Sequence, residues 1–101
     1  MPTSTKASLI PMETLEVVAK ALRVLAHPVR LKLVEVLLEE EIPVGELADR
    51  VGIAPHVASQ HLNNLRAHGL LAARRDGKNV LYRVVGPEAI NVIECIRRHY
   101  T

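Results

Sequence analysis

The sequence predicts a mainly α-helical domain that carries one small β-hairpin. Three observations predict it. Apolar residues recur at spacings of three and four along several segments, which is typical of amphipathic helices. Two of these segments are separated only by a short connection that begins with Gly52. Two aliphatic runs near the C-terminal end flank Asp76-Gly77, a strong hairpin signal. The expected order is four helices, two strands and a last helix.

Length and composition fit one domain and exclude several function classes. The chain has 101 residues, of which 49% are hydrophobic and 24% are charged. Only two residues are aromatic, so no stacking platform for RNA is expected. The sequence shows neither a signal peptide nor an apolar run of the roughly 20 residues that a membrane span needs, and its one cysteine forms no disulfide framework. We therefore expect a cytoplasmic protein with no RNA or membrane partner.

The first half of the chain reads as an arm and two helices. Residues 1–11 are polar, contain two prolines and are expected to form a flexible N-terminal arm, ahead of a single domain over residues 12–101. The apolar stripe predicts a first helix over Met12 to Ala26. Pro28 suits the first position of a second helix, which should be largely buried and should end near Glu39 to Glu41.

The next two helices form a helix-turn-helix pattern. A short helix from Val44 should stop at Gly52, and a fourth helix should run from Pro55 to about His68. One side of this fourth helix is apolar, whereas its other side is polar and almost uncharged. Such side chains can donate to and accept from base edges in a major groove, while a merely solvated face usually carries Glu and Lys. The predicted DNA-binding residues of this helix are Pro55, His56, Ser59, Gln60 and Asn63.

The hairpin completes a winged helix-turn-helix. Strand-like runs over Leu70 to Arg75 and Val80 to Val85 meet at the Asp-Gly turn. Residues 54–85 hold five basic residues against one acidic residue, a net charge of +4, whereas the rest of the chain has eight against ten and nets −2. This concentration of positive charge favours a polyanion, although it is also compatible with a solvated hairpin. The predicted DNA-binding residues of the wing are Arg74, Arg75, Lys78 and Asn79.

The last helix, from Pro87 to about Tyr100, adds an apolar stripe that the central unit does not need. Residues 27–85 already supply three helices and a hairpin with a core of their own. The stripes of the first and last helices therefore predict a twofold homodimer, which would place two DNA-binding helices about one turn of DNA apart, roughly 34 Å. The predicted interface residues are Leu15, Val18, Leu22, Ile90, Ile93 and Ile96.

Taken in order, several short motifs make the chain resemble the ArsR/SmtB family of bacterial repressors. The resemblance covers about residues 15–100 and implies a dimer formed by the terminal helices, a DNA-binding fourth helix, a wing, and release of double-stranded operator DNA by a signal. Its motifs are Ala21-Leu22 with Leu25-Ala26-His27-Pro28-Val29-Arg30-Leu31, Val44-Gly45-Glu46-Leu47-Ala48, Ser59-Gln60-His61-Leu62 with Leu65-Arg66, Gly69-Leu70-Leu71, and Arg75-Asp76-Gly77-Lys78 leading to Tyr82.

The chain departs from this family at the metal-sensing positions. Members of the family that sense arsenic or cadmium carry a Cys-x-Cys pattern at the start of the third helix. This sequence has Pro43-Val44-Gly45-Glu46 at that place, without a cysteine. Of the zinc and cobalt pattern on the last helix only Glu88 and His99 match, and the sequence ends at Thr101, before the last ligand position. Zinc takes at least three protein ligands even at open sites. We therefore expect no metal cofactor, with Glu88 and His99 as weak candidates.

Cys95 is the remaining chemical candidate. It lies one helical turn from His99, with Arg97 and Arg98 nearby, so a stabilised, redox-active thiolate is one interpretation. Family members that sense sulfur or oxidants use a cysteine pair, and here the second helix has none. A buried, inert thiol is the favoured interpretation, and a bond between subunits is the other alternative.

Two further function classes stay open on the sequence alone. A winged helix can serve as a protein-interaction module, but the outer face of the fourth helix would then be more apolar. A hydrolase using Cys95 with a histidine would need an oriented base and oxyanion donors, which the sequence does not supply. We therefore expect a DNA-binding regulator rather than an enzyme.

Overall fold

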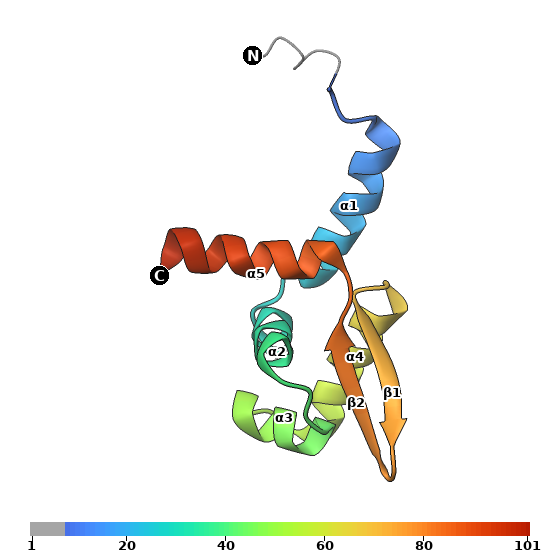
Figure 1. Cartoon of the computed structure of the whole chain (residues 1–101), viewed down its shortest axis with the longest axis vertical. Coiled ribbons are helices and arrows are strands. Elements are labelled where there is room, and N and C mark those ends of the chain that lie inside the picture. Colours follow the sequence, from blue (N-terminus) through green and yellow to red (C-terminus); the bar gives the residue numbers. More distant parts are fainter. Residues whose placement is uncertain (1–7) are drawn as a thin grey trace.

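The computed structural model describes residues 8–101 and confirms the predicted order of elements (Figure 1). Residues 1–7 of the predicted arm lie outside the described residues, and residues 8–11 belong to no helix or strand. The elements are α1 (Met12–Leu25), α2 (Pro28–Glu39), α3 (Val44–Val51), α4 (Pro55–Ala67), β1 (Leu71–Asp76), β2 (Asn79–Val84) and α5 (Pro87–Tyr100). None of the helices in the described part of the chain combines the length and the apolar character that a membrane crossing requires.

Local sequence sets the helix boundaries. His27 is extended and its Nδ1 accepts a hydrogen bond from the Val29 amide at 3.2 Å, so it caps α2, which begins at Pro28. Gly52 ends α3 with a φ of 82°, a left-handed conformation that favours glycine, and its amide donates to the Ala48 carbonyl at 2.8 Å. This tight turn leaves only a short connection before Pro55 opens α4.

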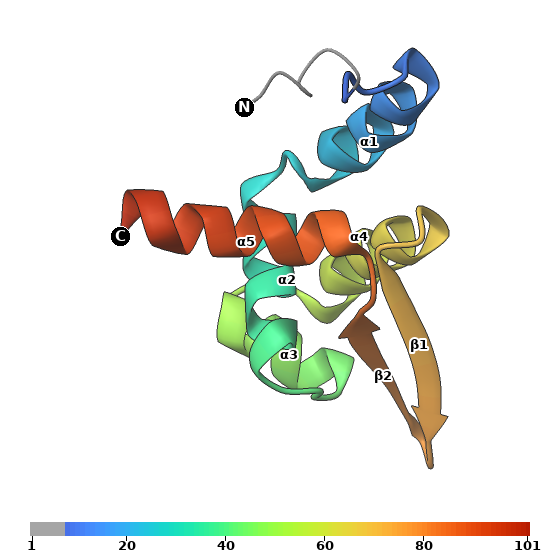
Figure 2. The same ribbon diagram turned by 45° about the horizontal axis from the view of Figure 1, so that its top comes forward.

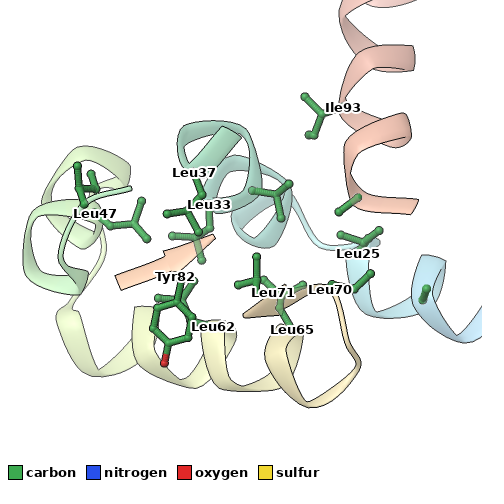
Figure 3. Close-up of a cluster of buried hydrophobic side chains, with 14 residues drawn as sticks. Leu25, Leu33, Leu37, Leu47, Leu62, Leu65, Leu70, Leu71, Tyr82 and Ile93 are labelled. Atoms are coloured by element: carbon green, nitrogen blue, oxygen red, sulfur yellow. The ribbon is translucent and has the colours of Figure 1, made fainter. Parts of the chain in front are cut away.

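A cluster rich in leucine holds the helix-turn-helix against α2 and the hairpin (Figure 3). Side chains from α2, α3 and α4 meet here, and none of the buried residues in the described part of the chain is polar apart from Tyr82. Burial of this kind is the main source of stability in a small domain. The fully or nearly fully buried members are Leu25, Leu33, Val34, Leu47, Leu62, Leu65 and Leu70.

The two strands pair in antiparallel register, with Asp76 opposite Asn79 and Gly77 at a φ of 64° in the turn. They lie within one residue of the predicted strands. Leu70 is not part of β1, because its amide donates to the Leu65 carbonyl and its own carbonyl accepts from Val85 and Gly86. Leu70 thus closes α4 and ties the start of the wing to its end, which explains the shift.

The terminal helices differ in how far they join the body. Figures 1 and 2 show α5 lying across α2, whereas α1 extends away from the rest of the chain. α5 buries Ala89 and Ile93 in the core of its own chain, and α1 contributes Ala21 and Leu25 near its C-terminal end. The sequence-based interpretation that both apolar stripes are surplus is therefore wrong for the C-terminal end of α1 and for part of α5.

Candidate nucleic-acid interface

The outer face of α4 carries the predicted polar residues. Ala58, Leu62 and Leu65 are buried beneath the helix, because positions three and four apart share one side of it. Their burial fixes which side of α4 is free. The predicted DNA-binding residues on the free side are exposed except for Ser59, which is half-buried; the exposed ones are Pro55, His56, Gln60 and Asn63.

Asn63 is held by the wing. The Tyr82 hydroxyl donates a hydrogen bond to the Asn63 Oδ1 atom at 3.2 Å, and the tyrosine ring lies in the core, with only 7% of the residue exposed. In Figure 3 the ring lies beside Leu62 and its oxygen points toward α4. The sequence does not predict this hydrogen bond. Tyr82 is one of only two aromatic residues, but the pairing depends on how β2 packs on α4, which no sequence spacing reveals.

The register of the wing separates its two arginines. Partners across an antiparallel pair share one face, so Arg75 opposite Val80 lies on the same face as Ala73 opposite Tyr82. Arg74 is paired with Leu81 on the other face, and its Nε donates to Glu41 Oε1 at 3.2 Å. The sequence-based prediction grouped both arginines together. The structure shows that Arg75 shares the face whose tyrosine contacts α4, whereas Arg74 contacts the loop before α3.

The other predicted DNA-binding residues of the wing lie at or near its tip. Arg75, Lys78 and Asn79 are exposed. Among residues 8–101 neither Arg75 nor Lys78 forms an ion pair, in contrast to Arg74. Unpaired cations on an exposed hairpin are free to approach phosphate groups.

A histidine and arginine cluster connects α4 to the junction between α1 and α2. Arg30 donates from Nε to His61 Nδ1 at 3.1 Å and from Nη1 to the Val24 carbonyl at 3.0 Å. The His27 and His61 rings lie 4.7 Å apart between centroids. Burial lowers the pKa of His61, and the nearby His27 and Arg30 lower it further. A neutral His61 is what the Arg30 hydrogen bond requires, since a protonated ring nitrogen cannot accept.

Half of the large exposed apolar residues in the described part of the chain lie on α1. Leu15 and Leu22 are 42% and 43% exposed, and Met12 and Val17, which the prediction omitted, are more exposed still. Val18, Ile90 and Ile96 are half-buried. A groove of about 380 Å³ runs between the two terminal helices, lined by Val18, Leu22, Pro87, Glu88, Asn91 and Val92.

Ile93 does not belong to this surface. The apolar stripe predicts it at the dimer interface, but it is only 5% exposed and packs into the core of its own chain. The stripe correctly identifies an apolar position, but it cannot show which surface covers it. Val92, one position away, lines the groove instead.

Glu88 and His99, the two residues that match the zinc and cobalt pattern, lie far apart in the chain's own fold. Glu88 lines the groove between α1 and α5, whereas His99 is exposed near the end of α5. Eleven residues along a helix correspond to about 16 Å, so one ion cannot bind both side chains of one chain. Residues 8–101 contain no cluster of three or more His, Cys, Asp or Glu side chains that could hold a metal ion. Within one chain these two residues therefore form no zinc site, and the expectation that the protein needs no metal stays a prediction.

Cys95 is exposed, so its interpretation as a buried thiol is wrong for the single chain. It lies on the side of α5 turned away from Ala89 and Ile93, which the helix buries. Arg97, a candidate for stabilising a thiolate, is instead engaged by α2: its Nη2 lies 3.2 Å from Glu39 Oε2 and 3.8 Å from Glu35 Oε2. The redox role of Cys95 stays a prediction.

Comparisons with known proteins agree with this geometry. The helix-turn-helix domain family HTH_20 matches residues 25–74. A biofilm growth-associated repressor from Xylella fastidiosa is 40% identical over 79 residues, which is 78% of this chain and 69% of the repressor. The chain belongs to the ArsR/SmtB family of transcriptional repressors. The prediction from the sequence motifs is thereby confirmed.

Solved ArsR/SmtB structures share the whole fold. The crystal structure of NolR from Sinorhizobium fredii matches with a TM-score of 0.80 and 34% identity, covering 91% of this chain and 94% of NolR. A homodimeric winged helix-turn-helix DNA-binding domain from Mycobacterium bovis matches with a TM-score of 0.75 and 26% identity, covering 97% of this chain and 85% of that domain. The winged helix-turn-helix fold is confirmed, and the chain is a DNA-binding transcriptional repressor. The alternative of a protein-interaction module has no support among the relatives.

Proposed function

We propose that this ArsR/SmtB repressor binds an inverted-repeat operator as a homodimer, with one α4 in each of two major grooves, and leaves it on a signal. The observation that carries the proposal is the outer face of α4. It presents amide, imidazole and hydroxyl groups without acidic side chains, and the wing that carries the unpaired cations contacts the same helix through Tyr82. Acidic groups would repel DNA, whereas these groups can pair with base edges.

The two parts of this surface have different roles. Gln60 and His56 on α4 contact base edges, where a bidentate amide pair with adenine contributes roughly 1 to 3 kcal/mol of discrimination. Arg75 and Lys78 of the wing contact phosphates and contribute affinity that depends on salt but not on sequence. Arg74 contributes less, because Glu41 already pairs with it.

The dimer forms through α1 and the neighbouring edge of α5. The exposed apolar residues on α1 cost free energy while they stay in water. The groove between α1 and α5 can bind an apolar helix of a second copy. The homodimeric domain from Mycobacterium bovis supports this assembly. We place Leu15, Val18, Leu22, Ile90 and Ile96 in the interface, and we add Val92.

The signal is neither zinc nor arsenic in this proposal. Neither ligand set is complete, so the repressor needs no metal cofactor to bind DNA. The chain is not an enzyme, and double-stranded DNA and a second copy are its partners, with no role for RNA or a membrane. It acts in the cytoplasm, where bacterial DNA lies.

The test is selection of duplexes from a random pool by the purified full-length chain, followed by sedimentation of the protein alone. We expect an enriched inverted repeat whose half-sites are about one helical turn, roughly 34 Å, apart, together with a dimer at micromolar concentration. Leu22→Asp should yield a monomer that loses operator binding, whereas Glu13→Gln, on the exposed first turn of α1, should leave both unchanged. Enrichment of no sequence, or a wild-type monomer, would overturn the proposal.

A further inference from the structure

Tyr82 is the one residue in the core of residues 8–101 whose polar atom reaches the DNA-facing helix. Its ring is packed among leucines, and its hydroxyl emerges beside α4 to donate to Asn63 Oδ1 at 3.2 Å (Figure 3). The position of this hydroxyl is set by the core and by the pairing of Tyr82 with Ala73 in the wing, rather than by the solvent-exposed tip. Asn63 itself is exposed.

In the structure the Asn63 amide lies with its oxygen toward the Tyr82 hydroxyl. A carboxamide has one oxygen that accepts and one NH₂ group that donates. With one lone pair of the oxygen engaged by Tyr82, the NH₂ group and the second lone pair are left for other partners. Asparagine pairs with adenine by donating through its NH₂ group and accepting through its oxygen, and the Tyr82 hydrogen bond leaves both functions available. The hydrogen bond thus orders the Asn63 amide before DNA binds.

We propose that Tyr82 is a positioning residue for DNA recognition, which orders the Asn63 amide for hydrogen bonding to a base edge in the major groove. The NH₂ group can donate there to purine N7, guanine O6 or thymine O4, and the oxygen can accept from adenine N6 or cytosine N4. The inference rests on the proposed function, because it requires α4 to lie in the major groove. It adds a contact between the wing and the base-reading helix, so that the wing influences sequence preference as well as affinity.

The cost of removing this hydrogen bond follows from the freedom that Asn63 would gain. An exposed asparagine without a partner samples several rotamers and both orientations of its amide. Ordering it on the operator would then reduce affinity, whereas the Tyr82 hydrogen bond orders it beforehand. A single hydrogen bond contributes about 0.5 to 1.5 kcal/mol, which corresponds to about a 2- to 13-fold change in affinity for each protomer.

The experiment is a double-mutant cycle with Tyr82→Phe and Asn63→Ala on the full chain. Binding is measured to the selected operator, to a scrambled duplex and to operators with each base pair substituted in turn. Tyr82→Phe keeps the ring in the core and removes only the hydroxyl. Tyr100→Phe is the matched control, because Tyr100 is 79% exposed at the end of α5, and it should change nothing. Thermal unfolding of each variant separates stability from DNA binding.

We expect Tyr82→Phe to weaken operator binding by about 2- to 13-fold per protomer and to leave binding to the scrambled duplex unchanged. Tyr82→Phe should reduce the preference for one base pair in each half-site. Asn63→Ala should reduce the preference for the same base pair. In the Asn63→Ala background, Tyr82→Phe should have no further effect on affinity, since the hydroxyl then has no amide to hold.

Two results would overturn the inference while leaving the proposed function intact. In one, Tyr82→Phe weakens both duplexes equally in both backgrounds, which would make Tyr82 a packing residue. In the other, Asn63→Ala weakens all duplexes by the same factor, which would assign Asn63 to a phosphate. If the wild type itself enriches no sequence, the proposed function fails, and this inference fails with it.

Discussion

The helix α4 and the wing are two parts of one surface, yet they are positioned by different means. α4 lies on a row of buried residues, and its outer face follows directly from the helical repeat. The wing extends from the body, as Figure 2 shows, and its outer half is exposed. Its faces follow from strand register, which places neighbouring arginines on opposite sides.

On the proposed function, this difference assigns a different kind of DNA contact to each part. A rigid helix on a packed core holds its side chains well enough to distinguish bases by hydrogen-bond geometry. A hairpin with exposed cations needs only to bring positive charge near phosphates, which tolerates movement. The Tyr82 hydroxyl is where the two meet, because it belongs to the wing and contacts α4.

The largest expected effect is on stability, and it falls on α4. Leu62→Ala removes a fully buried side chain beneath the helix and should lower the free energy of unfolding by about 2 to 5 kcal/mol. Val80→Ala in the half-buried part of the wing should cost about 1 kcal/mol or less. Urea unfolding of both variants measures the difference. Equal losses would show that the wing is as much a part of the core as α4 is.

The next effect distinguishes the two arginines of the wing. Arg75→Ala removes an unpaired cation from each protomer and should lower the magnitude of the slope of log affinity against log salt by up to about 2. Arg74→Ala should change this slope by less than half as much, because Glu41 partly neutralises Arg74. Operator titrations over a salt series measure both. Equal slope changes for the two variants would contradict the division of the wing into two faces.

The smallest effect is on pH dependence, and it concerns the support of α4. His61 has a lowered pKa in the folded chain, mainly because it is buried, whereas in the unfolded chain its pKa takes the ordinary value of about 6.5. Well above that pH both states are neutral at this position. As the pH falls below it, the unfolded chain binds a proton that the folded chain resists, so the free energy of unfolding falls.

The variant His61→Gln removes this titration and retains an acceptor for Arg30. Urea unfolding between about pH 7.5 and about pH 5 should therefore show a shallower loss of stability in the variant than in the wild type. A loss of the same steepness in both proteins would mean that other groups account for the pH dependence.

Most of the fold could be predicted from the sequence, because its signals are local. Gly52 and Pro55 delimit the turn between α3 and α4, and the Asp76-Gly77 turn defines the wing to within one residue. Each of these residues acts through its own backbone preference. The division of α4 into a buried and a free face follows from spacing alone.

What could not be predicted depends on which surfaces meet. The spacing of Ile93 shows an apolar position, but only the crossing of α5 over α2 shows that its own chain buries it. The expectation that Cys95 is buried is wrong for the single chain, because Cys95 lies on the side of α5 that the core does not cover. Three further pairings join residues 19 to 33 positions apart, and such pairings carry no local sequence signal. They are Tyr82 with Asn63, Arg74 with Glu41, and Arg30 with His61.

The division of labour between α4 and the wing is tested most directly by comparing Gln60→Ala with Arg75→Ala on operator and scrambled duplexes across a salt series. Gln60→Ala should reduce discrimination between the duplexes by roughly 1 to 3 kcal/mol in each half-site while leaving the salt slope unchanged. Arg75→Ala should lower the magnitude of the slope by up to about 2 and leave the ratio of the two affinities nearly fixed. If Gln60→Ala weakens both duplexes equally, or Arg75→Ala leaves the slope unchanged, the assignment of base contacts to α4 and phosphate contacts to the wing is wrong.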